Sequence, residues 1–330
     1  MVLKELIKEG TDTISQLYPE REAREMVLAY LEHRLGITRH THIIESGYKV
    51  EESDVVSIRS DFARMASGEP LQYVTGKAWF YGRQFNVSPD VLIPRPETEL
   101  LCRECTAGYE GVLANGGDDM PPPARGCLSE AKTGVIGTIV KTPTSRILDL
   151  CTGSGCIAWT LALEIPGAEV TGIDISDGAL TVASGQDFSE ELAMTSALKP
   201  HFVKADVLGK PMSDLGLYDI IVSNPPYVMD KEKALMRTNV LDHEPHLALF
   251  VSDDDPLIFY RAVAQWALLM LKPGGFGVVE INEALAPETE EVFRSSGFTD
   301  VRTIRDLNDR DRFVMFAKRN VPQQTVEQFV

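Results

Sequence analysis

The sequence contains no apolar run long enough to cross a bilayer, and its opening residues, 1–6, lack the pattern of a signal peptide. Its five cysteines are odd in number and show no paired spacing, which favours reduced thiols over a disulfide framework. A single Cys-x-x-Cys, formed by Cys102 and Cys105, has no second pair that would complete a zinc site. We therefore expect a soluble intracellular protein without a bound metal.

Basic charge is also scarce in this chain. The 32 lysines and arginines are outnumbered by 49 acidic residues, which gives a formal net charge of -17. Such a surface repels long nucleic acids unless basic residues gather in one patch, and the sequence has no such patch. We expect a monomer that binds neither nucleic acid nor membrane directly. A small substrate, or a protein with a basic surface, is the expected partner.

Composition divides the chain into regions. Residues 1–70 carry apolar residues at helical spacing and predict a small helical domain, which either only packs or also binds a substrate protein. Residues 71–95 are richer in aromatic and β-branched residues, which predicts a linking β-hairpin. Residues 96–330 alternate short apolar strands with amphipathic helices and form the expected catalytic domain. Within it, the Gly- and Pro-rich stretch 107–144 is expected to be a flexible insertion.

The most informative stretch runs from Tyr218 to Tyr227. Its apolar run predicts a buried strand that must end at Pro225, because proline donates no hydrogen bond to a sheet. Asn224 therefore lies at the carboxyl end of a strand, the edge where open α/β sheets bind ligands. Its amide oxygen, the Pro225 carbonyl and the Tyr227 ring suit a planar group that carries an NH2. Taken alone, the prolines could equally end a strand before a loop.

A nucleotide-binding pattern lies upstream of this strand. Strand 146–150 leads into a Gly-bearing turn at 151–156, and the next strand ends at Asp174, about twenty residues after the glycines. Glycines let the backbone approach a ligand, the following helix N-terminus is electropositive, and the acid suits ribose hydroxyls. Further strands are expected at 201–206, 276–281, 301–304 and 313–317.

In this order the motifs resemble those of class I S-adenosylmethionine-dependent methyltransferases, and within that class the PrmC/HemK family of release factor glutamine methyltransferases. The motifs that carry the resemblance are Leu92-Ile93-Pro94-Arg95-Pro96-Glu97-Thr98-Glu99, the turn from Asp149 to Gly155, Ser223-Asn224-Pro225-Pro226-Tyr227, Glu244-Pro245, and the segment 305–312. The resemblance implies an α/β fold with a doubly wound, mostly parallel, seven-stranded sheet.

The resemblance also implies cofactor contacts. Residues 152–155 would line the methionine part of S-adenosyl-L-methionine, Asp174 would hold its ribose, and Asp206 with Val207 would border its adenine. Two positions depart from the family pattern: Cys151 replaces the usual first glycine of the turn, and Val207 stands where some members carry an aromatic residue. The implied cofactor-binding set is Asp149, Cys151, Thr152, Gly153, Ser154, Gly155, Asp174, Asp206, Val207 and Asn224.

The implied reaction transfers a methyl group to the side-chain amide nitrogen of the glutamine in the Gly-Gly-Gln motif of class-one release factors, leaving S-adenosyl-L-homocysteine. An amide nitrogen is a poor nucleophile because its lone pair is delocalised into the carbonyl. Hydrogen bonds to Asn224 and Pro225 would hold the amide so that its nitrogen faces the methyl group. The implied catalytic residues are Asn224, Pro225 and Tyr227, and the implied substrate-binding residues add Pro226, Arg95 and Glu97.

Two alternatives stay open at this point. An N6-adenine methyltransferase of nucleic acids could use the same Asn-Pro-Pro-Tyr site, although the negative charge speaks against it. A cofactor-binding interaction protein without turnover would leave Asn224, Tyr227 and Asp174 without a purpose. Relatives of this kind occur in the bacterial cytoplasm and in organelles. An acidic start without an Arg-rich amphipathic segment favours the bacterial cytoplasm.

Overall fold

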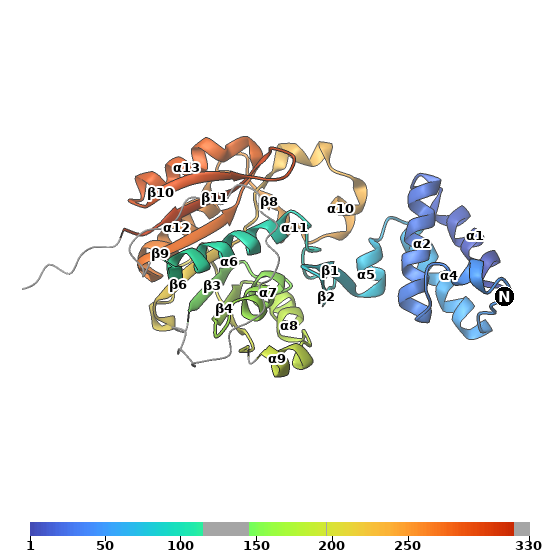
Figure 1. Cartoon of the computed structure of the whole chain (residues 1–330). Coiled ribbons are helices and arrows are strands. Elements are labelled where there is room, and N and C mark those ends of the chain that lie inside the picture. The colour runs from blue at the N-terminus through green and yellow to red at the C-terminus, as the bar shows by residue number, and fades with distance from the viewer. Residues whose placement is uncertain (115–144, 196, 320–330) are drawn as a thin grey trace, which may run out of the picture.

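The computed structural model describes residues 1–114, 145–195 and 197–319. A helical N-terminal lobe lies at one end of the molecule and a lobe built on a large sheet lies at the other, with a small hairpin between them (Figure 1). In the part of the chain that is described, no helix combines the length and the apolar character needed to cross a membrane.

The N-terminal lobe consists of α1 (Leu3–Ile14), α2 (Glu20–Leu35), α3 (Thr41–Ile44) and α4 (Glu52–Ala66). Helix α2 ends at Gly36, which adopts the left-handed conformation typical of helix ends. The lobe has its own core, in which the rings of Tyr30 and Phe62 meet edge to face with centroids 5.5 Å apart. Helix α1 passes close to Phe62, where the bare Gly10 leaves room for the ring. The predicted helical character of residues 1–70 is confirmed.

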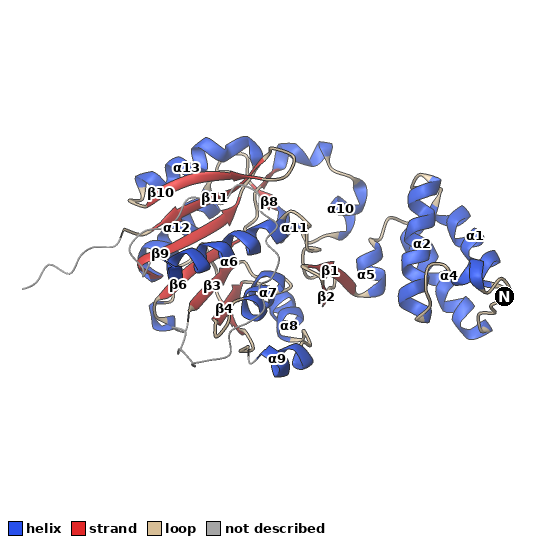
Figure 2. Cartoon of the chain, in the orientation of Figure 1, coloured by secondary structure: helices blue, strands red, loops and turns tan. Residues whose placement is uncertain are grey.

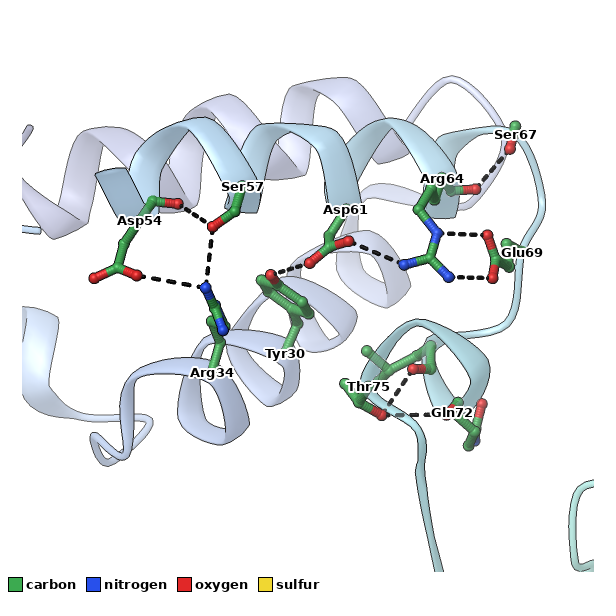
Figure 3. A network of polar contacts seen from close by, with 11 residues as sticks. Tyr30, Arg34, Asp54, Ser57, Asp61, Arg64, Ser67, Glu69, Gln72 and Thr75 are labelled. Carbon is green, nitrogen blue, oxygen red and sulfur yellow. Dashed lines mark hydrogen bonds and ion pairs between the residues drawn. The ribbon is translucent and has the colours of Figure 1, made fainter. Parts of the chain in front are cut away.

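A chain of polar contacts joins α2, α4 and the turn that follows α4 (Figure 3). The Tyr30 hydroxyl donates to Asp61 Oδ2 at 2.6 Å, and Asp61 Oδ1 accepts from Arg64 at 3.1 Å. The Arg64 guanidinium also grips Glu69 through two nitrogens. Tyr30 is 2% exposed, so its hydrogen bond to Asp61 is the buried end of this chain.

The connection between the lobes is partly helical, which differs from the all-β prediction for residues 71–95. Helix α5 (Leu71–Thr75) begins after Pro70 and ends at the left-handed Gly76. The hairpin then pairs β1 (Lys77–Phe80) with β2 (Arg83–Asn86) across a turn at Tyr81 and Gly82, both of which have positive φ. The five residues of α5 are too few for helical spacing to stand out from the aromatic and β-branched composition.

The large lobe is organised by a seven-stranded sheet with the order β10-β11-β9-β6-β3-β4-β5. Its strands are β3 (Arg146–Leu150), β4 (Glu169–Asp174), β5 (His201–Lys204), β6 (Tyr218–Ser223), β9 (Leu271–Glu280), β10 (Thr299–Arg305) and β11 (Asp311–Ala317). All neighbours pair parallel except β11, which runs antiparallel to both β9 and β10. The predicted mostly parallel, seven-stranded sheet is confirmed.

Helices cover both faces of this sheet (Figure 2). Side chains of α6 (Thr98–Ala114) and α7 (Cys156–Glu164) pack on one face, and those of α12 (Ile258–Met270) and α13 (Ala286–Ser295) pack on the other. Successive residues of β3 alternate between them, with Ile147 in the first core and Leu148 in the second. Burial on both faces explains why the strands read as continuous apolar runs.

The remaining elements are short and mostly lie at the rim of the sheet. They are α8 (Asp177–Ser184), α9 (Ser189–Thr195), η1 (Ser213–Leu215), β7 (Val228–Met229), η2 (Asp230–Leu235), α10 (Thr238–His243), α11 (His246–Leu249), β8 (Phe250–Val251) and η3 (Glu283–Leu285). Strands β7 and β8 pair parallel in a separate two-stranded sheet.

Predicted boundaries differ from the structure in several places, most of all at α6 and β9. Helix α6 continues to Ala114, into the predicted insertion, because Leu101, Cys105 and Tyr109 bury one helical face despite the small residues between them. The rest of the insertion, 115–144, lies outside the described residues. Strand β9 begins at Leu271 rather than at Phe276, so the Lys-Pro-Gly-Gly segment belongs to the strand, where its pairing with β6 is irregular.

We expect Tyr30→Phe to lower the opening free energy of the N-terminal lobe by about 1 kcal/mol, because Asp61 loses its buried hydroxyl donor. Amide hydrogen exchange in α2 and α4 measures that free energy. Tyr109→Phe is the control, since the buried Tyr109 hydroxyl has no hydrogen-bond partner in the described residues. Equal exchange rates in wild type and Tyr30→Phe would contradict the role given to this bond.

Candidate active site

The parallel register brings the ends of separate strands to one level. Leu150 of β3 pairs with Ile173 of β4 and with Ser223 of β6, and Ser223 pairs in turn with Val279 of β9. The residues that follow these four, Cys151, Asp174, Asn224 and Glu280, therefore lie side by side at the carboxyl edge of the sheet. This is the edge at which open α/β sheets bind ligands.

The turn after β3 is shaped by left-handed backbone conformations. Cys151 has φ +62°, and Gly153 and Gly155 have φ +53° and +77°. A side chain at Gly155 would also meet Ala183 and Phe202 at 3.0 and 3.1 Å, so glycine is required there for space as well. The turn delivers the chain into α7, whose first amides face the same side as the strand ends.

Asp149 stabilises the turn through a hydrogen bond with Thr152. The Thr152 hydroxyl donates to Asp149 Oδ2 at 2.6 Å, and the carboxyl group is fully buried. Burial raises the pKa of Asp149 to about 7, with the nearby Asp174 charge acting in the same direction and the Thr152 bond opposing it. Asp149 thus holds Thr152 in place from beneath the turn.

Asp174 is held rigidly by backbone amides. Its Oδ2 accepts from Gly153 N and its Oδ1 from Ser176 N, each at 2.9 Å. Burial raises the pKa of Asp174, while these backbone bonds oppose the shift. Each carboxylate oxygen keeps a further lone pair for a ligand hydroxyl.

These strand ends open onto a cavity of about 320 Å³. Its floor is the Gly-bearing turn with Asp174, and its walls come from the loop before α6, the segment after β5, the end of β6 and α11. The residues that line it include Leu92, Thr98, Val207, Asn224, Leu247 and Phe259. The apolar side chains among them provide surfaces for a planar ring.

The structure brings most of the sequence-predicted site residues to this cavity. Those that line it are Arg95, Cys151, Thr152, Gly153, Ser154, Asp174, Asp206, Val207, Asn224 and Pro226. Asp149, Gly155, Pro225 and Tyr227 lie next to these residues in the chain but do not themselves form the lining, and neither does the exposed Glu97.

Arg95 makes an ion pair within the cavity wall. Its guanidinium donates to Glu244 Oε1 at 2.6 Å, and the backbone N–H of Ile93 donates to Glu244 Oε2 at 3.2 Å. The Glu244 side chain is only 1% exposed. The pair therefore fastens the Arg-Pro-Glu-Thr-Glu loop to the segment that leads into α11.

Asn224 belongs to a buried hydrogen-bond chain. Its Nδ2 donates to Thr98 Oγ1 at 3.2 Å, and the Thr98 hydroxyl donates to Glu280 Oε2 at 2.8 Å. The other oxygen of Glu280 accepts from the Tyr227 hydroxyl at 3.0 Å. Burial and the nearby Glu280 raise the pKa of Tyr227 well above its usual range, so this hydroxyl keeps its proton.

Sequence reasoning did not assign a role to Thr98 or Glu280. Thr98 stands inside the quoted Arg-Pro-Glu-Thr-Glu motif, and Glu280 is the last residue but one of the predicted strand 276–281. An acid at the end of a buried strand, next to the strand that ends at Asn224, is the signal that could have pointed to Glu280. Phe259 carried no such signal, because it belongs to an ordinary amphipathic segment.

No group of three or more His, Cys, Asp or Glu residues in the described ranges could hold a metal ion. Cys102 and Cys105 are buried, free thiols on α6. The donor set of the cavity instead fits a nucleoside, since a fixed carboxylate at the end of β4 suits vicinal hydroxyls and the apolar walls suit a planar base.

A sheet of this order, a Gly-bearing turn after its first parallel strand, an acid at the end of the second and Asn-Pro-Pro-Tyr after the fourth define a class I methyltransferase. Comparison with known families agrees: residues 5–76 match the PrmC N-terminal domain and residues 130–247 match the methyltransferase small domain.

Relatives identify the family within this class. The chain is 35% identical to a release factor glutamine methyltransferase of Bacteroides thetaiotaomicron over 92% of its own length and 95% of the relative. It is 31% identical to one of Flavobacterium psychrophilum over 95% and 98%, and 37% identical to one of Koribacter versatilis over 78% and 77%. The protein belongs to the release factor glutamine methyltransferase family.

We expect Asp149→Asn to gain stability relative to wild type as the pH rises from 5 to 8. The pKa of Asp149 is about 4 in the unfolded chain and about 7 in the folded protein. Its contribution to stability therefore falls as the pH rises between these two values. The gain should be about 2 kcal/mol in the free energy of unfolding measured by denaturant at the two pH values. The exposed Asp12→Asn sets the baseline, and a pH-independent difference for Asp149→Asn would refute the expectation.

Proposed function

We propose that this enzyme transfers a methyl group from S-adenosyl-L-methionine to the side-chain amide nitrogen of the glutamine in the Gly-Gly-Gln motif of class-one peptide chain release factors. The observation that carries the proposal is the position of Asn224. It lines the same cavity as Asp174, and its NH2 group is tied back to Thr98. A carboxamide held in this way has its oxygen available for the N–H of a substrate amide.

The cavity residues divide among the parts of the cofactor. Asp174 would hold the ribose hydroxyls, Asp206 and Val207 would border the adenine, and the turn 152–154 would line the methionine part. The apolar Leu92 and Phe259 support binding of a flat base. When bound, S-adenosyl-L-methionine supplies an electrophilic methyl group on a sulfonium.

The protein contributes by positioning the glutamine. Asn224 Oδ1 and the Pro225 carbonyl would accept the two N–H bonds of the substrate amide and aim its nitrogen into the cavity. As positive charge develops on that nitrogen, both hydrogen bonds strengthen. The Tyr227 ring would pack on the amide plane, oriented by its hydroxyl bond to Glu280. The proton leaves to solvent after transfer, so no general base is required.

The net charge of the enzyme supports the proposal that its substrate is a protein. At a formal net charge of -17 the enzyme is suited to a partner with a basic surface, and the helical N-terminal lobe offers a second contact area beyond the cavity. We propose that it acts as a monomer in the bacterial cytoplasm, in keeping with the bacterial sources of its relatives.

Asn224→Ala should reduce methylation of release factor by about a hundredfold or more, because the substrate amide loses an acceptor that positions it. The dissociation constant for S-adenosyl-L-methionine, measured by calorimetry, should change little. Transfer is followed as a mass increase of one methyl group on intact release factor. Asn308→Ala, at an exposed turn, is the matched control.

Equal turnover in wild type and Asn224→Ala would exclude the role proposed for Asn224. Methylation of duplex DNA instead of release factor by the wild-type enzyme would exclude the proposed substrate.

Raising the salt concentration should raise the KM for intact release factor. Electrostatic attraction between the acidic enzyme and a basic partner is screened over about 10 Å at 0.1 M salt. Steady-state rates at several salt concentrations measure the effect. A short peptide that contains Gly-Gly-Gln serves as the control, since it lacks the basic surface. A KM for the intact factor that does not respond to salt would contradict charge-assisted docking.

A further inference from the structure

We infer that Thr98 and Glu280 are positioning residues that decide which atom of the Asn224 carboxamide faces the substrate. This inference deepens the proposed function and rests on it. Neither residue was assigned a role from the sequence, and both are buried, with 2% of each exposed. Thr98 is the first residue of α6, and Glu280 is the last residue of β9.

The number of protons on each side chain fixes which group donates in each hydrogen bond that links Asn224 through Thr98 to Glu280. The Thr98 and Tyr227 hydroxyls each donate to one oxygen of Glu280, which accepts both hydrogen bonds. A threonine hydroxyl has one proton, and Thr98 gives its proton to Glu280. Thr98 can then only accept from Asn224, so the group that Asn224 presents at 3.2 Å must be its NH2.

The two hydroxyls that contact Glu280 favour its ionised form. Burial raises the pKa of Glu280, and the charge of Glu97 acts in the same direction, but the bonds from Thr98 and Tyr227 and the charge of Arg312 all oppose the shift. A buried carboxylate is tolerated when its oxygens are hydrogen-bonded. Both oxygens of Glu280 meet that condition.

The orientation of Asn224 matters for the reaction. Because a carboxamide is planar, tying its nitrogen to Thr98 turns its oxygen away from Thr98. A substrate amide that must present its nitrogen needs an acceptor from the enzyme. With Asn224 reversed, two NH2 groups would face each other and neither could accept. Thr98 and Glu280 thus select the productive orientation before the substrate arrives.

Thr98→Val tests the inference, because valine keeps the shape of threonine and removes its hydroxyl. We expect kcat for release factor methylation to fall on the order of tenfold to a hundredfold, while the dissociation constant for S-adenosyl-L-methionine stays within about twofold. Thr98→Ser restores the hydroxyl and should recover most of the lost rate. Thr289→Val in α13 is the control for a buried threonine, since its hydroxyl has no partner in the described residues.

A double-mutant cycle separates positioning from a merely structural role. In an Asn224→Ala background there is no carboxamide to orient, so Thr98→Val should cost less than about twofold in kcat there. Additive losses would overturn the inference. So would an unchanged kcat in Thr98→Val, or a Thr98→Ser variant that folds normally but is as slow as Thr98→Val.

A measurement without turnover keeps the inference testable apart from the proposed function. The side-chain NH2 signals of Asn224 are observed by NMR after selective ¹⁵N labelling of asparagine. They should shift in Thr98→Val and keep their wild-type positions in Thr98→Ser and Thr289→Val. Identical signals in wild type and Thr98→Val would overturn the inference. If wild type fails to methylate release factor while these shifts appear, the proposed substrate is wrong but the orientation of Asn224 stands.

Discussion

The parallel pairing of β3, β4, β6 and β9 is the constraint on which the site depends. Because Leu150, Ile173, Ser223 and Val279 share one level in the sheet, the residues after them meet at a single edge. At this edge Cys151 begins a tight turn and Asp174 supplies an acid. Asn224 supplies an amide, and Glu280 a buried carboxyl group. A shift of one residue in any of these pairings would send the side chain to the other face of the sheet.

In the proposed reaction, the Asn224 carboxamide at this edge recognises the side-chain amide of the substrate glutamine. Such recognition is sensitive to direction, because a carboxamide carries a donor and an acceptor of nearly equal size. The enzyme meets this requirement with a fixed sequence of donors and acceptors that ends on an acid inside the protein. Burying a carboxyl group is costly, and its use here is consistent with a need for orientation rather than for stability.

The parts of the site that are contiguous in sequence could be predicted from it. Local sequence patterns mark a strand end at the turn 151–156, at Asp174 and at the Asn-Pro-Pro-Tyr segment. The structure places these three strand ends together. Contacts between distant segments could not be predicted in this way. Thr98 meets Glu280 across 182 positions and Ile93 meets Glu244 across 151, and no local pattern encodes either pairing. Short helices such as α5 were missed because five residues hold too little periodicity.

The backbone conformation at Cys151 restricts which residues can replace it. At φ +62° a β-carbon is tolerated only at a steric cost, which glycine avoids and which is higher for branched side chains. Glycine at this position would meet no steric obstacle, whereas valine or isoleucine would distort the turn that forms the floor of the cavity. Cysteine, whose β-carbon is unbranched, is tolerated in this turn.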